Sequence, residues 1–466
     1  MKKKITFRAI ALFAMCITAN LWPSKANAQI ITTVAGNGTT AMTFGCCGDG
    51  GAATLAEFAQ TPSVTIDGSG NLFITDFFGA QIRKVNTSGI VTTIAGLAGS
   101  GYTGDGGPAS AAYLGAPDYI ISDGAGNLYF SDLSNSLVRK INTSGVITTV
   151  AGVVGAGGST GDGGPATAAA VNQPSGLALD GAGNLYICEY SLRVRKVNTS
   201  GIISTVAGSG VYGYSGDGGP ATAAKFKNPT AIAIDGSGNL FIADEYNNAI
   251  RKVNTAGIIT TIAGNGTQGF AGDGGPASAA LFNSPIDIKF DAAGNLFIAD
   301  RDNERIRKIS TAGVVSTVAG DGSRGYTGDG GAATAATLWA PEGVAFDAAG
   351  NLYIGDDSNS VIRKVTPDIS LGASQVSTIK NKISLSPNPN NGSFTLSGNL
   401  NSTSDVMLSV NVTDIIGNTV YTGKFLTQKG AVAVQVNPGA NLPDGVYLLH
   451  INSEGENEVL RFVIEH

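Results

Sequence analysis

Histidine is nearly absent from this sequence of 466 residues: the only two are His450 and His466, so residues 29–365 have none. Histidine is the most frequent general base near neutral pH and a common zinc ligand. Ser-His-Asp and Cys-His catalytic pairs and histidine-ligated zinc are therefore excluded from residues 29–365. Catalysis there would have to use carboxylates, tyrosine or a metal held by oxygen ligands.

Cysteines and long apolar runs are also scarce. Four cysteines occur without C-x-x-C spacing, which predicts neither a disulfide framework nor a zinc site. Cys46 and Cys47 are adjacent, and the sequence does not decide whether they form a vicinal disulfide in an exported protein. After residue 28 no stretch approaches the roughly 18 consecutive apolar residues that a membrane helix needs. We therefore predict no direct membrane span.

Basic residues are outnumbered by acidic ones. Charged residues make up 14% of the chain, and beyond residue 28 there are 24 basic and 35 acidic residues, a formal charge of −11. An uncompensated basic surface is the usual requirement for binding phosphate backbones. We therefore expect no nucleic-acid partner.

Residues 1–28 have the three parts of a secretory signal peptide. Residues 2–4 are lysines, residues 10–21 form an apolar stretch too short to span a membrane, and residues 26–28 form a small-residue cleavage site. The pattern predicts that the chain is exported.

The remaining sequence is dominated by an internal repeat. An Arg-Lys pair recurs every 56 residues from Arg83 to Arg363, and Gly-Asn-Leu and Gly-Asp-Gly-Gly each occur six times. Each copy holds four short β-branched or apolar runs separated by turn residues, as at 64–66, 72–74, 82–85 and 90–94. Four-stranded repeats near 50 residues bury their faces by packing radially. The repeat predicts an all-β, six-bladed β-propeller.

The ring is predicted to close through its N-terminal strand. The sixth copy lacks a fourth strand, whereas residues 30–36, Ile-Ile-Thr-Thr-Val-Ala-Gly, repeat the outer strand of the other copies. Residues 30–365 number 336, which is six times 56. We expect residues 30–36 to pair into the last blade and leave no open sheet edge there.

These residues resemble the NHL repeat family. The resemblance rests on Asn-Pro-Thr-Ala-Ile-Ala-Ile-Asp at 228–235, Gly-Asn-Leu-Phe-Ile-Ala-Asp at 238–244, Ile-Arg-Lys-Val at 250–253 and Thr-Ile-Ala-Gly at 261–264. The resemblance covers residues 30–365 of the predicted propeller domain, residues 29–365. The resemblance implies a propeller that binds proteins, nucleic acids or glycans, with a few enzymes among its members, so it constrains fold more than function.

The repeat ends after residue 365. Residues 366–382 are predicted to be a linker, and residues 383–466 contain alternating runs typical of a small Ig-like β-sandwich. Ser-Pro-Asn-Pro at 386–389, residues 412–418, Leu-Pro-Asp-Gly-Val-Tyr at 442–447 and Phe-Val-Ile at 462–464 resemble the type A C-terminal sorting domain of the type IX secretion system. The resemblance implies export to the outer-membrane surface or medium of a Gram-negative bacterium, through that machinery. The final Glu465-His466 departs from the basic ending common in such domains.

Charged residues present in every copy are interpreted as structural. Acids end each second strand, and a group shared by all six blades is best explained by bonding to turn backbone. The Arg-Lys pairs are accompanied by as many acids, which favours interblade packing and ion pairing over a nucleic-acid stripe.

Side chains that differ between copies mark the candidate binding face. In a meander, the turn between second and third strands and the link between blades share one face. The other face repeats its turns with close variants, whereas the copies differ on this one. The residue after the proline of each inner strand changes from Ser63 to Asp118, Ser175, Thr230, Ile286 and Glu342. The candidate binding residues are Phe77, Phe78, Asp118, Tyr119, Tyr190, Arg193, Tyr246, Asp287, Arg301, Glu304, Trp339 and Glu342.

Two functions are compatible with this pattern. The first is a monomeric, metal-free module that binds an extracellular protein or glycan at the cell surface. The alternative is a gluconolactonase-like hydrolase or lyase with a divalent cation at the channel mouth, for which Asp118 and Glu342 are the candidate ligands. No matching catalytic motif is present, so we predict no catalytic residues.

Overall fold

The computed structural model describes residues 29–39, 48–97, 99–366, 383–387, 390–400, 404–414, 419–439, 442–443, 445–453 and 456–464. Contacts divide the chain into two compact units between residues 369 and 370. The predicted signal peptide, Cys46 with Cys47, and residues 367–382 of the predicted linker lie outside the described residues.

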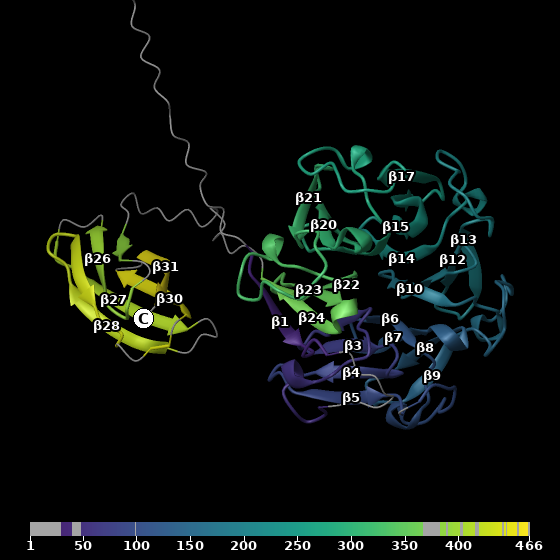
Figure 1. Ribbon diagram of the computed structural model, residues 1–466, viewed down its shortest axis with the longest axis horizontal. Coiled ribbons are helices and arrows are strands. Elements are labelled where there is room, and N and C mark those ends of the chain that lie inside the picture. The colour runs from purple at the N-terminus through teal and green to yellow at the C-terminus, as the bar shows by residue number, and fades with distance from the viewer. Residues whose placement is uncertain are drawn as a thin grey trace, which may run out of the picture. The chain divides into compact units, whose positions relative to one another are not determined.

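The first unit consists of six four-stranded antiparallel sheets arranged around an axis (Figure 1), as the repeat predicts. Blades one to three comprise β2 (Val64–Ile66), β3 (Leu72–Asp76), β4 (Gln81–Val85), β5 (Val91–Ala95); β6 (Pro117–Ser122), β7 (Leu128–Asp132), β8 (Leu137–Ile141), β9 (Ile147–Ala151); and β10 (Pro174–Leu179), β11 (Leu185–Glu189), β12 (Arg193–Val197), β13 (Ile203–Ala207). Blades four to six comprise β14 (Pro229–Ile234), β15 (Leu240–Asp244), β16 (Ala249–Val253), β17 (Ile259–Ala263); β18 (Pro285–Phe290), β19 (Leu296–Asp300), β20 (Arg305–Ile309), β21 (Val315–Ala319); and β22 (Pro341–Phe346), β23 (Leu352–Asp356), β24 (Val361–Val365) with β1 (Ile31–Ala35).

Short 3₁₀ turns accompany every blade. One set lies in the links between blades: η1 (Ala53–Leu55), η2 (Ala109–Ala111), η4 (Ala166–Ala168), η5 (Ala221–Ala223), η7 (Ala277–Ala279) and η9 (Ala333–Ala335). The other set follows second strands: η3 (Leu133–Asn135), η6 (Glu245–Asn247), η8 (Arg301–Asn303) and η10 (Asp357–Asn359). The second set lies on the face where the sequence copies differ.

The ring closes as the sequence predicts. Strand β1 pairs antiparallel with β24, with Ile31 opposite Val365 and Thr32 opposite Lys364. Figure 1 shows the purple β1 beside the green β24, although these strands lie at opposite ends of the propeller sequence. Blade six therefore has four strands and no exposed edge at β24.

The core lies between neighbouring blades. Second strands such as β15 and β19 are buried along their whole length, which explains their continuous apolar runs. Phe241 meets Phe290 edge to face at 4.9 Å between ring centroids, and Phe297 meets Phe346 in the same way at 4.8 Å. Aromatic pairs of this kind join blade four to blade five and blade five to blade six.

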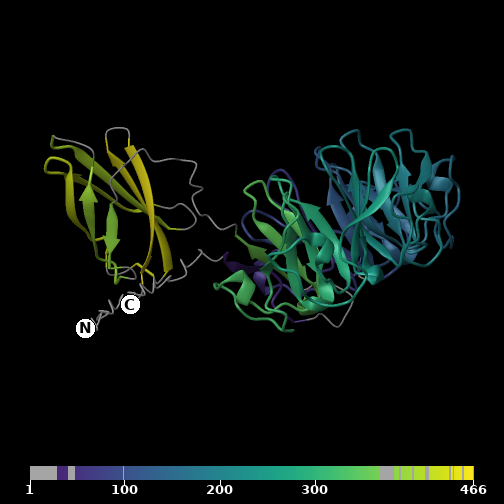
Figure 2. The same cartoon turned by 90° about the horizontal axis from the view of Figure 1, so that it is seen from above.

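The second unit is a two-sheet β-sandwich (Figures 1 and 2), as predicted. One sheet contains β25 (Ser384–Ser386), β26 (Phe394–Asn399) and β29 (Ala431–Val436), and the other contains β27 (Met407–Asp414), β28 (Thr419–Leu426), β30 (Gly445–Ser453) and β31 (Glu456–Ile464). Phe394 and Phe462 pack in its core with ring centroids 4.6 Å apart. Within the described part of the chain, no helix is long and apolar enough to cross a membrane.

Candidate functional site

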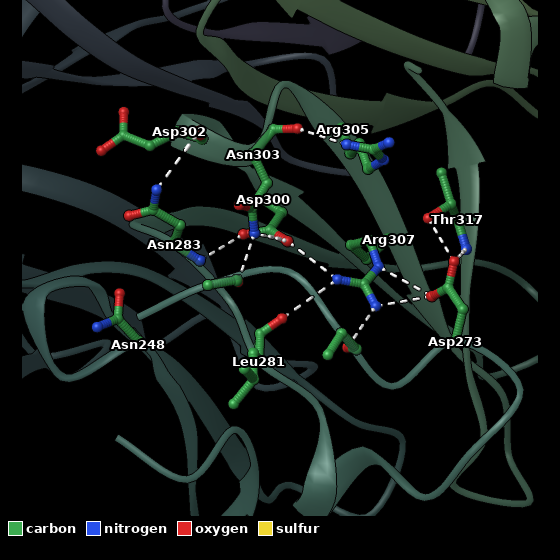
Figure 3. A network of polar contacts seen from close by, with 12 residues as sticks. Asn248, Asp273, Leu281, Asn283, Asp300, Asp302, Asn303, Arg305, Arg307 and Thr317 are labelled. Atoms are coloured by element: carbon green, nitrogen blue, oxygen red, sulfur yellow. Dashed lines mark hydrogen bonds and ion pairs between the residues drawn. The ribbon is translucent and has the colours of Figure 1, made fainter. Parts of the chain in front are cut away.

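The repeated charges form one ion-pair network per blade. Figure 3 shows it in blade five, where the buried Arg307 on β20 points between Asp300 and Asp273. Arg307 Nη2 lies 2.7 Å from Asp273 Oδ1, and Nη1 lies 3.1 Å from Asp300 Oδ2. Asp300 Oδ1 accepts a bond from the Asn283 amide at 2.8 Å. The same arginine and its two acids recur in all six blades, which confirms the structural interpretation.

Burial differs at the two ends of this network. Burial raises the pKa of Asp300 to about 6, even though Arg307 and backbone amides favour its charged form. The pKa of Asp273 is lowered, because hydrogen bonds from Thr317 and Arg307 outweigh its partial burial. A perturbed pKa that recurs with the fold therefore marks architecture in this protein, and the functional site has to be sought elsewhere.

A cavity of about 350 Å³ opens at the channel mouth on the blade-variable face. It receives side chains from all six blades. Eight of the twelve predicted residues line it: Phe77, Asp118, Tyr119, Tyr190, Tyr246, Asp287, Arg301 and Glu342. Gln60, Pro62 and Leu133 line it as well, and nothing in their repeat positions singled them out.

The predicted ring of inner-strand residues is correct in five blades and wrong in blade one. Pro62 lines the cavity at the position where Asp118 and Glu342 stand in their blades, whereas Ser63 is buried one residue further along. Ser63 Oγ accepts a hydrogen bond from the Ile120 amide at 3.2 Å. In blade one the proline stands one repeat position later than in the other five blades, so the residue after it is also one position late. In an extended strand, a shift of one residue moves a side chain to the other face.

Arg301 and Glu342 join blades five and six across the cavity. Arg301 Nε, at the start of η8, lies 2.7 Å from Glu342 Oε1 on β22. Burial, together with the charges of Glu342 and Asp287, raises the pKa of Asp118 to about 7. Burial also raises the pKa of Glu245 to about 7. At neutral pH the carboxyl groups of Asp118 and Glu245 are therefore partly protonated and partly ionised.

Two of the lining residues, Tyr119 and Asp287, bond to each other from opposite blades. The Tyr119 hydroxyl donates to Asp287 Oδ1 at 2.6 Å, and Asp287 Oδ2 accepts the Val344 amide at 2.8 Å. Lys289 Nζ lies 5.1 Å from the centre of the Tyr119 ring, and the same lysine lines a second cavity of about 350 Å³ at the opposite ends of the inner strands. Burial lowers the pKa of Lys289.

Four predicted binding residues lie outside this cavity. Glu304 is buried and accepts hydrogen bonds from Arg324 Nε at 2.8 Å and from the Ala340 amide at 2.6 Å. Its carboxylate therefore links blade five to the chain that leads into blade six and does not face the cavity. The remaining three are Phe78, whose ring packs against Phe77 at 5.0 Å, Arg193, which donates to the Ser209 carbonyl, and the half-exposed Trp339.

The predicted cation ligands do not form a metal site. Among the residues that the structure describes, no three histidine, cysteine or acidic side chains are grouped so that they could hold a metal ion. Asp118 and Glu342 both line the cavity, but Arg301 already occupies Glu342 Oε1. Ca²⁺ takes about six to eight oxygen ligands, from carboxylates, carbonyls and water. The arrangement therefore does not support the proposed cation at Asp118 and Glu342.

Family comparisons agree with both parts of this architecture. Residues 384–465 match the secretion system C-terminal sorting domain, and residues 14–101, 155–215 and 212–269 match the teneurin NHL domain. The chain is an NHL-type propeller with a type IX secretion sorting domain. The sorting domain indicates export by that system to the cell surface or the extracellular space.

The NHL-type propeller has distant relatives of known sequence and structure. It is 28% identical to teneurin-4 of Mus musculus over 372 residues, which cover 72% of this chain but 13% of teneurin-4. A protein of unknown function from Bacteroides thetaiotaomicron VPI-5482 shares the fold with a TM-score of 0.55, 19% identity, and coverage of 73% of this chain and 76% of that one. An auxiliary nutrient binding protein of the same bacterium gives a TM-score of 0.53 at 16% identity, covering 72% and 76%.

Proposed function

We propose that the exported propeller is a binding module that takes up part of an extracellular protein or glycan at the channel mouth. The observation that carries this proposal is the cavity of about 350 Å³, to which all six blades contribute on the one face where their sequences differ. Its volume lies in the range of known ligand pockets, about 300–1,000 Å³. The opposite face carries closely similar turn sequences, such as Asp-Gly-Ser-Gly at 67–70 and Asp-Ala-Ala-Gly at 291–294, as expected for a structural surface.

Aromatic side chains at the rim supply the contact area. Tyr190 and Tyr246 line the cavity while about half of each side chain remains exposed, at 47% and 52%. Rings held in this way stack on sugars or on peptide side chains at low conformational cost. Phe77 and Phe78, packed edge to face, extend the same rim.

A second candidate function is acid–base catalysis without a metal. Asp118 and Glu245 face the cavity with pKa values of about 7, which suits proton transfer near neutral pH. A screen of lactone hydrolysis and lyase substrates with the exported chain tests this candidate, and turnover abolished by Asp118→Asn would favour it over simple binding.

Binding panels test the main proposal. The exported chain is applied to glycan arrays and to surface proteins of neighbouring cells, beside Tyr190→Ala and Tyr246→Ala. Tyr212→Ala is the matched control, because Tyr212 is an exposed aromatic that contacts Lys227 and does not line the cavity. Loss of a ligand in the two rim variants but not in the control supports the channel mouth. Equal binding by all four proteins contradicts it.

A further inference from the structure

The channel-mouth cavity carries more negative than positive groups. Its titratable acids are Asp118, Glu245, Asp287, Glu342 and Asp357. Its remaining titratable groups are the phenols Tyr119, Tyr190 and Tyr246 and one cation, Arg301, with Asp302 beside Arg301 and Lys289 behind Asp287.

Three of these five acids have partners within the protein. Glu342 pairs with Arg301 at 2.7 Å. Asp287 accepts from the Tyr119 hydroxyl and from the amides of Ile288 and Val344. Glu245 Oε2 accepts from Asn228 Nδ2 at 2.6 Å. Their charges are therefore already bound into the framework of the cavity.

The other two acids are less fully paired, although Asp357 takes one hydrogen bond from the Thr61 backbone and is attracted by Arg301. Asp357 is 3% exposed, and its Oδ1 is buried without a hydrogen bond among the described residues. The Asp118 carboxylate takes part in no hydrogen bond or ion pair within the same described part of the chain; its strongest interactions are with the charges of Glu342 and Asp287. A buried acceptor left unpaired is unfavourable, and a hydrogen-bond donor on a ligand would pair with it.

The rim around these acids suits an organic cation. The rings of Phe77, Tyr190 and Tyr246 line the same cavity, and aromatic faces attract ammonium and guanidinium groups. The guanidinium of Arg301, which lies between Glu342 and Asp302, shows that a planar cation fits among these groups. A cavity of about 350 Å³ admits one such group on an alkyl chain and excludes a folded domain.

We propose that the channel mouth binds a guanidinium or primary ammonium group, free or on a basic peptide side chain, with Asp118 and Asp357 as its anionic partners. The proposal rests on the binding function above and names the chemistry of its ligand.

Proton release follows from the same geometry. The pKa of Asp118 is about 7, and burial together with Glu342 raises the pKa of Asp357 well above its ordinary value. The empty site therefore holds protons at pH 6, and a bound cation displaces them because it stabilises both carboxylates. Since a guanidinium keeps its charge at all these pH values, its affinity rises from pH 6 to pH 8.

Calorimetric titration of the full exported chain with n-butylguanidinium, n-butylammonium and the neutral n-butylurea tests the proposal. We expect both cations to bind and butylurea not to bind. Butylguanidinium should bind at least about fivefold more tightly at pH 8 than at pH 6, with a heat that depends on the ionisation enthalpy of the buffer. Asp118→Asn and Asp357→Asn should each weaken binding at least about tenfold and reduce proton release. Glu57→Gln, a carboxyl outside the cavity, should change neither.

Peptides separate the two sources of the cation. Acetyl-Gly-Arg-Gly-amide binding more tightly than butylguanidinium, while its citrulline analogue does not bind, supports a peptide ligand; weaker binding of the arginine peptide supports a free cation. Equal affinity for butylurea and butylguanidinium overturns the proposal, as does absence of binding by a wild-type chain that melts cooperatively. If a glycan or protein binds through Tyr190 while neither cation binds, the inference fails and the binding function stands. If no probe binds at all, both fail.

Discussion

The hydroxyl of Tyr119 in blade two donates a hydrogen bond to Asp287 in blade five, with 2.6 Å between the two oxygens. This bond spans the channel, because blades two and five face each other in a ring of six. On one side of it lies the acidic mouth, and on the other lies the second cavity, which is lined by Lys289 and by no acidic residue among those that the structure describes. The two ends of the channel therefore offer different chemistry to a ligand.

Removing this hydroxyl should loosen the propeller. Tyr119→Phe leaves Asp287 buried with one donor fewer, so we expect the free energy of unfolding to fall by about 1–2 kcal/mol. Urea denaturation followed by circular dichroism measures the change. Tyr129→Phe, whose ring contacts Lys140 on the same blade, should lose less than about 0.5 kcal/mol. Equal losses in both variants would show that the hydrogen bond from Tyr119 to Asp287 contributes no more to the free energy of unfolding than the Tyr129 hydroxyl does.

The repeated arginine should be far more important for stability than the lysine beside it. Arg307→Met removes the cation shared by Asp273 and Asp300, and breaking a buried pair of this kind costs about 3–5 kcal/mol. Lys308→Met, at the next position of β20, is the matched control and should cost under about 0.5 kcal/mol. Urea midpoints of both variants test the difference, and similar midpoints would contradict the structural role of the network.

The empty channel mouth should make the propeller more stable in mild acid. The pKa values of Asp118 and Glu245 are raised to about 7 in the fold, so protons favour the folded state. Their contribution is complete below the unfolded pKa values, near 4, and is lost as the pH rises through about 7. The melting temperature should therefore fall between pH 5 and pH 8, and less steeply in Asp118→Asn. Parallel curves for wild type and variant would exclude a contribution from Asp118.

Two glycines of one turn should differ in their tolerance of a side chain. Gly104 has φ +91°, and a Cβ there would lie 2.6 Å from the Ala112 Cβ; Gly106 has φ +81° with nothing within 4 Å. Gly106→Ala should cost only the backbone term of about 1–2 kcal/mol, whereas Gly104→Ala adds a steric clash and should cost about 1–3 kcal/mol more. Thermal melts of both variants check this order, which equal shifts would refute.

The architecture could be predicted from the sequence because the same pattern of strands and turns occurs six times. Six equivalent Arg-Lys pairs fixed the number of blades, and one orphan strand sequence at 30–36 fixed the closure. Asp118 and Glu342 were found as cavity residues because they break an otherwise neutral ring position.

The site could not be fully predicted because side-chain direction is not periodic. Glu304 differs from its counterparts in the other blades as a ligand residue would, yet its carboxylate turns inward to Arg324 and the Ala340 amide. Trp339 differs in the same way and lies outside the cavity. Asp357 Oδ1 has no hydrogen bond within the described part of the chain, and the charges that act on Asp357 come from other blades as well as its own, which no single repeat encodes.

The pairing of β1 with β24 also determines which contacts of the propeller form last during folding. Ile30 and Thr366 bond although they are 336 positions apart, and contacts of such sequence separation form late because loop closure must precede them. Strand β1 therefore stays unpaired until β24, the last propeller strand to be synthesised, is available. Until blade six has been synthesised, the nascent propeller exposes an unpaired sheet edge at each end, the kind of surface through which chains aggregate.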